Sequence, residues 1–69
     1  MTTDNRMTYH LETLDRQGRV THEGITDTLK HCVLGPWTPL PDGGEQATGW
    51  MPAYLGGKRV GRTRVRVTR

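Results

Sequence analysis

Arginine side chains at alternate positions are the feature of this sequence with the clearest chemical meaning. Near the end of the chain, Arg62, Arg64 and Arg66 alternate with uncharged residues. On a β-strand, side chains two positions apart point the same way and lie roughly 6.6–7 Å apart along the strand. Guanidinium groups donate paired hydrogen bonds to phosphate or carboxylate oxygens. The spacing therefore predicts a row of cations that can follow the phosphates of a nucleic acid.

The distribution of charge points to the same segment. Residues 58–69 carry six basic side chains and no acidic one, whereas residues 1–57 carry four basic and seven acidic side chains. The net charge of +3 therefore hides a strong division along the chain. We predict that the residues binding a nucleic acid or an acidic partner are Lys58, Arg59, Arg62, Arg64, Arg66 and Arg69. Trp50, Tyr54 and Trp37 are candidate stacking platforms for bases.

Two further roles of the basic strand are compatible with the sequence. The same guanidiniums suit the carboxylates of an acidic protein surface. Charged side chains on an edge strand also prevent edge-to-edge aggregation, without any ligand. The sequence alone does not choose among these roles.

Zinc ligands are present in type but not in pattern. His10, His22, His31 and Cys32 match no compact zinc motif in their order and spacing. Adjacent His31 and Cys32 would point in different directions on either a helix or a strand. We predict no metal and no cofactor, and we expect Cys32 to act as a small buried hydrophobic residue.

The sequence carries no catalytic signature, so we expect a protein that is not an enzyme. Cys32 has only a sequence neighbour, His31, as a base, and neighbours in sequence do not form a catalytic dyad in space. Glu12 and Glu23 are expected to face each other across a hairpin. Like-charged neighbours on a solvated sheet face need no catalytic explanation. In "GGKRVGRT", Lys58 is not followed by the Ser or Thr that a phosphate-binding loop requires.

The composition limits the size of the hydrophobic core. Only 32% of the 69 residues are hydrophobic and none is Phe. A chain this short buries about 60% of the surface that its unfolded form exposes. We therefore expect Tyr9, Trp37, Trp50 and Tyr54 to supply much of the core. A homodimer would ease the shortage of buried surface.

Domain limits and location follow from composition as well. We expect residues 1–6 to be a flexible N-terminus and residues 7–69 to form a single small domain. A single cysteine excludes an internal disulfide and favours the cytoplasm. The sequence shows neither a signal peptide nor a membrane span.

Both ends of the domain are predicted to be β-hairpins. Residues 7–14 alternate in polarity, the turn "DRQG" follows, and residues 19–26 form the return strand. At the other end, "WMPAYL" precedes a Gly56–Gly57 turn and a final strand. Pro52 places the first of these strands at an edge or a bulge. On the final strand, the face with Thr63, Val65 and Val67 is expected to pack.

The middle of the chain is less regular. Hydrophobic residues at helical spacing, with a stop signal at Gly35–Pro36, favour a short helix over residues 26–34, and a strand is the alternative. The proline- and glycine-rich residues 35–49 predict an irregular loop that Trp37 anchors to the core. The loop also has a PxxP-like pattern typical of protein ligands, a less favoured interpretation.

Together these elements predict a small α+β domain made of a β-hairpin, a short helix, a proline/glycine-rich loop and a C-terminal β-hairpin. The alternative is a small all-β, SH3-like barrel. The predicted function is that of a small nucleic-acid-associated accessory or regulatory protein. The alternative is a protein-binding modulator or inhibitor that docks its basic strand on an acidic partner. Small size and divided charge are similar in style to accessory proteins of phages and other mobile elements, although no motif indicates a family.

Overall fold

The computed structural model describes residues 8–69, and the regular structure in that range is entirely β-strand. The strands are β1 (Tyr9–Leu14), β2 (Val20–Thr26), β3 (Val33–Leu34), β4 (Thr38–Pro39), β5 (Glu45–Leu55) and β6 (Lys58–Thr68). They form one antiparallel sheet in the order β2-β1-β6-β5-β3, and β4 also pairs with β5. The expected α+β class is therefore wrong, and the small all-β alternative fits.

The predicted helix over residues 26–34 is absent because local side chains hold a different turn. The Thr26 hydroxyl accepts a hydrogen bond from the Thr28 backbone N–H at 3.3 Å. The Cys32 N–H donates to the Leu29 carbonyl at 2.9 Å, which closes a single turn. Such local bonds compete with a helical ladder. The chain then extends into β3, which pairs with β5.

Both predicted hairpins are confirmed. In the β1–β2 turn, Asp15 accepts hydrogen bonds from the backbone N–H groups of Gln17 and Arg19, each at 2.9 Å, and Gly18 has φ of 81°. In the β5–β6 turn, φ is 59° at Gly56 and 80° at Gly57. Two successive positive φ values give a two-residue turn whose twist matches the flanking strands.

Strand β5 begins at Glu45, so the loop expected over residues 35–49 is wrong in its second half. The glycines that suggested a loop include Gly49, which lies inside β5 opposite Leu34. A Cβ atom at Gly49 would overlap the Val33 carbonyl oxygen and lie 2.8 Å from the Leu34 Cα. Gly49 therefore permits the close approach of β3 rather than breaking the strand.

The fully buried core is formed by small side chains at the centre of the sheet. Ala47, Val65 and Val67 are the buried hydrophobic residues of the described range. Val67 pairs with Ala47 on β5 and with Leu11 on β1, so the core lies where three strands meet. The prediction that Val65 and Val67 pack is confirmed.

The prediction of an aromatic core is wrong. Tyr54 is 64% exposed, and Trp50 is only half-buried. Side chains alternate along β5, so both residues lie on the face opposite Val65. Tyr9 and Trp37 are also half-buried and lie against each other, with ring centroids 6.4 Å apart. Trp37 thus anchors its loop to β1 as expected, but at the margin of the core.

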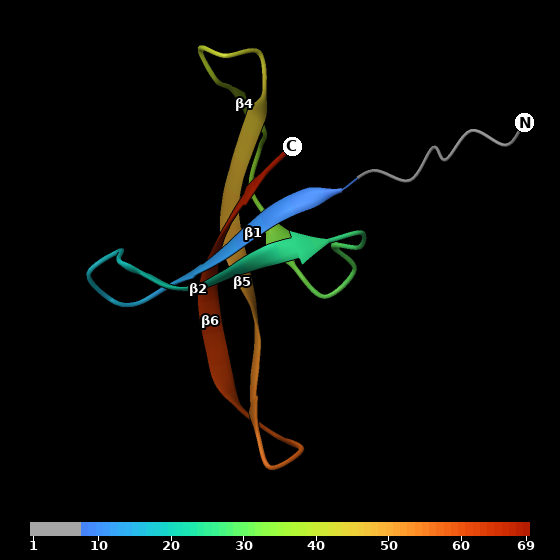
Figure 1. Cartoon of the computed structure of the whole chain (residues 1–69). Helices are drawn as coiled ribbons and strands as arrows, with labels where there is room; N and C mark the ends of the chain where they lie inside the picture. Colours follow the sequence, from blue (N-terminus) through green and yellow to red (C-terminus); the bar gives the residue numbers. More distant parts are fainter. Residues whose placement is uncertain (1–7) are drawn as a thin grey trace, which may run out of the picture.

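The two hairpins cross, and the longer one extends beyond the other (Figure 1). Strand β1 pairs with β6 only along Arg64 to Thr68, and β3 pairs with β5 only at Gly49 and Trp50. Beyond these positions β5 and β6 pair only with each other within the described part of the chain. We call residues 51–63 the ribbon. Pro52 lies in it, where β5 has an open outer side, as its missing N–H predicted.

The N-terminus predicted to be flexible, residues 1–6, and Met7 of the first predicted strand lie outside the described residues. Within residues 8–69 there is no helix of the length and apolar character needed to cross a membrane.

Candidate functional site

The predicted row of arginines lies on one face of the sheet. Along β6, Arg62, Arg64 and Arg66 pair with Pro52, Trp50 and Thr48 of β5. Because side chains alternate, the three guanidiniums point away from buried Val65 and Val67. The predicted division of β6 into a packed face and an arginine face is therefore confirmed.

A β-bulge adds Arg59 to this face. The pairing of β5 with β6 shifts by one residue between Ala53 and Tyr54, which leaves Val60 without a partner on β5. Gly61, beside it, has φ of 153°, a value that favours glycine. Without the bulge, Arg59 would point to the opposite face, because its position differs from that of Arg62 by an odd number. We call Arg59, Arg62, Arg64 and Arg66 the arginine face.

Trp50 organises two members of the arginine face. The guanidinium carbon of Arg59 lies 5.8 Å from the centroid of the indole ring, and that of Arg62 lies 5.3 Å from it. Both distances fall within the range of cation–π attraction, which orients the guanidiniums beside the ring. Trp50 was predicted as a stacking platform for a ligand, and in this structure its ring contacts arginine side chains of the protein itself.

The arginine face borders an open concavity of about 820 Å³ between the β1–β2 turn and the β5–β6 hairpin. It is lined by Leu14, Asp15, Arg16, Thr48, Gly49, Trp50, Arg62, Thr63, Arg64 and Arg66. Arg16 was not predicted as a site residue. Arg16 lines the concavity because Leu14 pairs with Arg64, which places the β1–β2 turn beside β6. Its own sequence surroundings contain no signal of this proximity.

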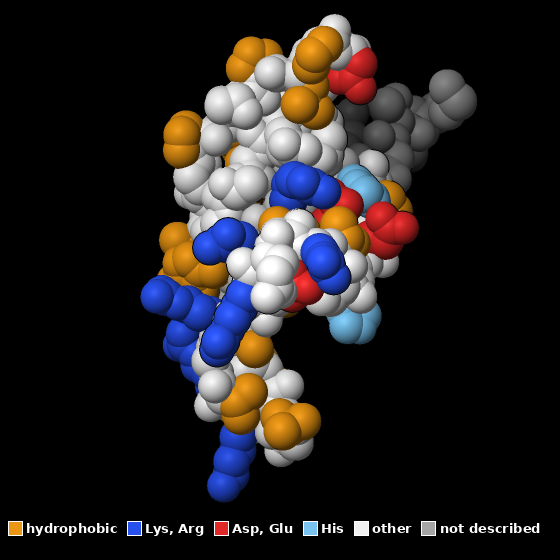
Figure 2. Space-filling model, turned by 90° about the vertical axis from the view of Figure 1, so that its left-hand side faces the viewer, with side chains coloured by type: hydrophobic (Ala, Val, Ile, Leu, Met, Phe, Trp, Pro, Cys, Tyr) orange, Lys and Arg blue, Asp and Glu red, His pale blue; other side chains and the backbone are white. Residues whose placement is uncertain are grey.

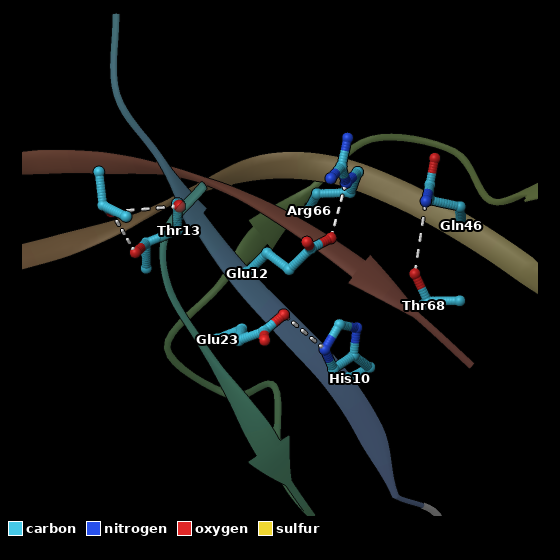
Figure 3. Close-up of polar contacts among 8 residues, drawn as sticks. His10, Glu12, Thr13, Glu23, Gln46, Arg66 and Thr68 are labelled. Atoms are coloured by element: carbon cyan, nitrogen blue, oxygen red, sulfur yellow. Dashed lines mark hydrogen bonds and ion pairs between the residues drawn. The ribbon is translucent and has the colours of Figure 1, made fainter. Parts of the chain in front are cut away.

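Arg66 is held by an internal ion pair. Its Nε donates to Glu12 Oε1 at 2.8 Å, from the directly opposite position on β1 (Figure 3). The Glu12 side chain is only 12% exposed. The hydrogen bond from Arg66 lowers the pKa of the Glu12 carboxyl, and the pKa of Arg66 is raised by the same bond. Much of the charge of Arg66 is therefore already neutralised.

The predicted pairing of Glu12 with Glu23 across the first hairpin is confirmed. The two carboxylates turn to different partners: Glu12 faces Arg66, while Glu23 Oε2 lies 3.4 Å from His10 Nε2 (Figure 3). Each acid thus has a cationic or proton-donating neighbour of its own, which relieves the repulsion between them.

Arg69 also forms an internal ion pair, with Glu45. It contacts Glu45 through Nη2 and through Nε, each 3.0 Å from Oε1. Its guanidinium carbon lies 3.9 Å from the centroid of the Trp37 ring. Backbone hydrogen bonds in both directions between Arg69 and Glu45 hold the end of the chain in place. Arg69 and Trp37 thus stabilise the end of the sheet away from the arginine face.

Arg59, Arg62 and Arg64 differ from Arg66 and Arg69 in having no carboxylate partner among residues 8–69. All three are exposed. Figure 2 shows Lys and Arg side chains gathered on this side of the molecule, with hydrophobic side chains beside them at the lower end. Lys58 follows the Gly56–Gly57 turn at the tip of the hairpin, away from the concavity.

The candidate zinc ligands do not gather. Nowhere in residues 8–69 do three His, Cys, Asp or Glu side chains come together as a metal site. Cys32 is half-buried, and burial raises the pKa of its thiol, which lowers the fraction of reactive thiolate.

Comparisons of this chain with protein-family models, with curated proteins and with solved structures gave no match.

Proposed function

We propose that this protein acts by binding nucleic acid through the arginine face. The observation that carries the proposal is the set of three exposed guanidiniums without carboxylate partners in residues 8–69, on Arg59, Arg62 and Arg64. Arg62, Arg64 and Arg16 line the concavity. Arg59 does not line it and shares the Trp50 ring with Arg62. Unpaired guanidiniums in a shared hollow attract a polyanion and release its counterions on contact.

Protection of a sheet edge accounts poorly for Arg64, whereas Arg59 and Arg62 lie where β6 has no partner on its outer side. Such protection requires an edge strand, and β6 lies between β1 and β5 along Arg64 to Thr68. Arg64 therefore presents its charge from the face of a central strand, where no neighbouring sheet can pair. A ligand is the better reason for the unpaired charge of Arg64.

The arginines around the concavity have different roles in binding. Arg64 and Arg16 contact phosphates, because both line the concavity from adjoining elements. Arg59 and Arg62 are oriented by Trp50 and so lose less side-chain entropy on binding. A regulatory or accessory role in the cytoplasm is part of this proposal and is supported by the small size and the single cysteine.

A salt titration with matched charge variants tests the proposal. Binding to a labelled random-sequence nucleic acid is measured by fluorescence anisotropy between roughly 50 and 200 mM salt. The double substitution Arg62→Ala/Arg64→Ala is expected to reduce the slope of log affinity against log salt by about 0.7–0.9 for each phosphate that is no longer neutralised. The control, Arg19→Ala/Lys30→Ala, removes the same charge from exposed positions outside the concavity. It is expected to leave most of the affinity in place.

Equal losses of affinity in the two double variants would show that only the net charge matters, which contradicts a site on the arginine face. Absence of binding to any nucleic acid at low salt would contradict the proposal as a whole. The acidic protein partner would then be the ligand class to pursue, because guanidinium binds carboxylate in the same geometry.

A further inference from the structure

The ribbon is a two-stranded projection from the sheet, and its shape limits which ligands it can contact. Its two strands, Met51 to Leu55 and Lys58 to Thr63, have no other partner strand in the described part of the chain. Five residues of β-strand extend roughly 17 Å. Figure 1 shows this end of the β5–β6 hairpin projecting past the β1–β2 hairpin. The ribbon is therefore free to enter a groove that the rest of the sheet cannot.

The charge of the ribbon is entirely positive. It carries Lys58, Arg59 and Arg62, and the chain has no acidic residue from Gln46 to its last residue. Near the tip, three large hydrophobic side chains are well exposed: Tyr54 at 64%, Leu55 at 75% and Val60 at 62%. Exposed apolar side chains between cations suit a surface that is both anionic and partly apolar.

The major groove of B-form DNA has these properties. It is about 12 Å wide and admits a two-stranded β-ribbon, and its floor displays thymine methyl groups and the acceptor atoms of guanine. The major groove of A-form RNA is deep and too narrow for side chains to read. Single strands instead call for several exposed stacking faces. Of the two candidates on β5, the Trp50 ring contacts Arg59 and Arg62, which leaves the exposed Tyr54 ring.

We propose that the ligand is double-stranded B-form DNA and that the ribbon inserts into its major groove. This inference rests on the proposed function. Arg59 and Arg62, oriented by Trp50, face the base edges. Arg64 and Arg16, at the base of the ribbon, contact the flanking phosphates, because the concavity that they line lies where the ribbon leaves the sheet.

The test compares three probes of one sequence: duplex DNA, duplex RNA and single-stranded DNA, each titrated with the intact protein at the same salt concentration. Binding to duplex DNA is expected to be about tenfold tighter than to duplex RNA, since the phosphate charge is similar but the groove differs. Netropsin, which fills the minor groove, is expected to leave DNA binding unchanged.

Two kinds of result would contradict the expected preference for duplex DNA. Equal binding to the two duplexes, tighter binding to the single strand, or displacement by netropsin would overturn groove insertion and leave the proposed function standing. Failure to bind any of the three probes would instead overturn the proposed function.

A shortened ribbon separates shape from charge. Deleting Tyr54, Leu55, Lys58 and Arg59 removes two complete cross-strand pairs, Tyr54 with Arg59 and Leu55 with Lys58. The control, Arg19→Ala/Lys30→Ala, removes the same charge from exposed positions outside the ribbon and keeps the ribbon at full length. Circular dichroism checks that both variants fold. The shortened protein is expected to bind the two duplexes within about twofold of each other, whereas the control retains a DNA preference. Equal preferences in the two variants would overturn the inference.

Discussion

Neighbouring arginines on β6 differ in whether their guanidinium groups are free to bind a ligand, because different residues lie opposite them on β1. Arg66 faces Glu12 and forms a short hydrogen bond, whereas Arg64 faces Leu14 and Trp50 and forms no ion pair with an acid of residues 8–69. The type and spacing of these residues are the same. Only the cross-strand neighbour decides whether the cation stabilises the sheet or attracts a ligand.

The pairing of Glu12 with Arg66 makes stability depend on pH. The folded-state pKa of Glu12 lies below its ordinary value of 4.5, so its stabilisation is fully present above that pH and is lost as the pH falls through the folded-state pKa. Glu12→Gln is expected to lower the free energy of unfolding by about 1 kcal/mol at pH 7 and by less at acid pH. Thermal unfolding at pH 7 and at pH 3 measures both values.

Glu23→Gln is the matched control, because Glu23 is the directly opposite acid on β2 and its side chain is 64% exposed. A loss of stability at pH 7 as large as that of Glu12→Gln would contradict a special role for the Glu12–Arg66 pair.

At the scale of elements, glycine residues determine which strands can meet and which side chains share a face. Gly49 admits β3 to the edge of β5, and Gly61 at the bulge turns Arg59 toward Arg62. Both glycines lie inside strands, where glycine usually weakens pairing. Their positions indicate close approach and a bulge instead of a loop.

Gly49→Ala is expected to lower the free energy of unfolding by about 1–3 kcal/mol, because the added Cβ would overlap the backbone of β3. Chemical denaturation measures the loss. The control is Gly24→Ala on β2, where an added Cβ meets nothing within 4 Å. That change is expected to stay within about 0.5 kcal/mol. Similar losses at both positions would show that β3 does not approach β5 as closely as described.

At the scale of the whole molecule, the sheet is held by a very small core. The buried hydrophobic side chains of residues 8–69 are Ala47, Val65 and Val67, and the larger apolar residues are half-buried or exposed. Domains of this size rarely obtain more than about 3–5 kcal/mol from one core. The homodimer expected from the sequence stays a prediction, and it is consistent with so small a core.

Val65→Ala is expected to cost about 2 kcal/mol, a large share of the total, because Val65 has no exposed surface. The midpoint of urea denaturation should fall accordingly. Val20→Ala, at a position that is 43% exposed on β2, is the control and should change stability by less than about 0.5 kcal/mol. A small effect at Val65 would contradict a core centred on β6.

Local structure was predictable where consecutive residues encode it. Alternating polarity and the paired glycines at 56 and 57 predicted both hairpins, and the same alternation predicted that Arg62, Arg64 and Arg66 share a face. The helix and the aromatic core were wrong because short apolar runs fit either period, and because burial depends on which face of a strand meets the others.

By itself, the sequence determined the charge division, the two hairpins and the arginine row, since each depends on periodicity or turn chemistry within a few residues. Only the tertiary structure placed β6 at the centre of the sheet and joined Glu12 to Arg66 across 54 positions of sequence. It also brought Arg16 beside Arg64 and turned Arg59 toward Trp50. These contacts depend on the register between distant strands, which packing of the whole sheet fixes and no local pattern encodes.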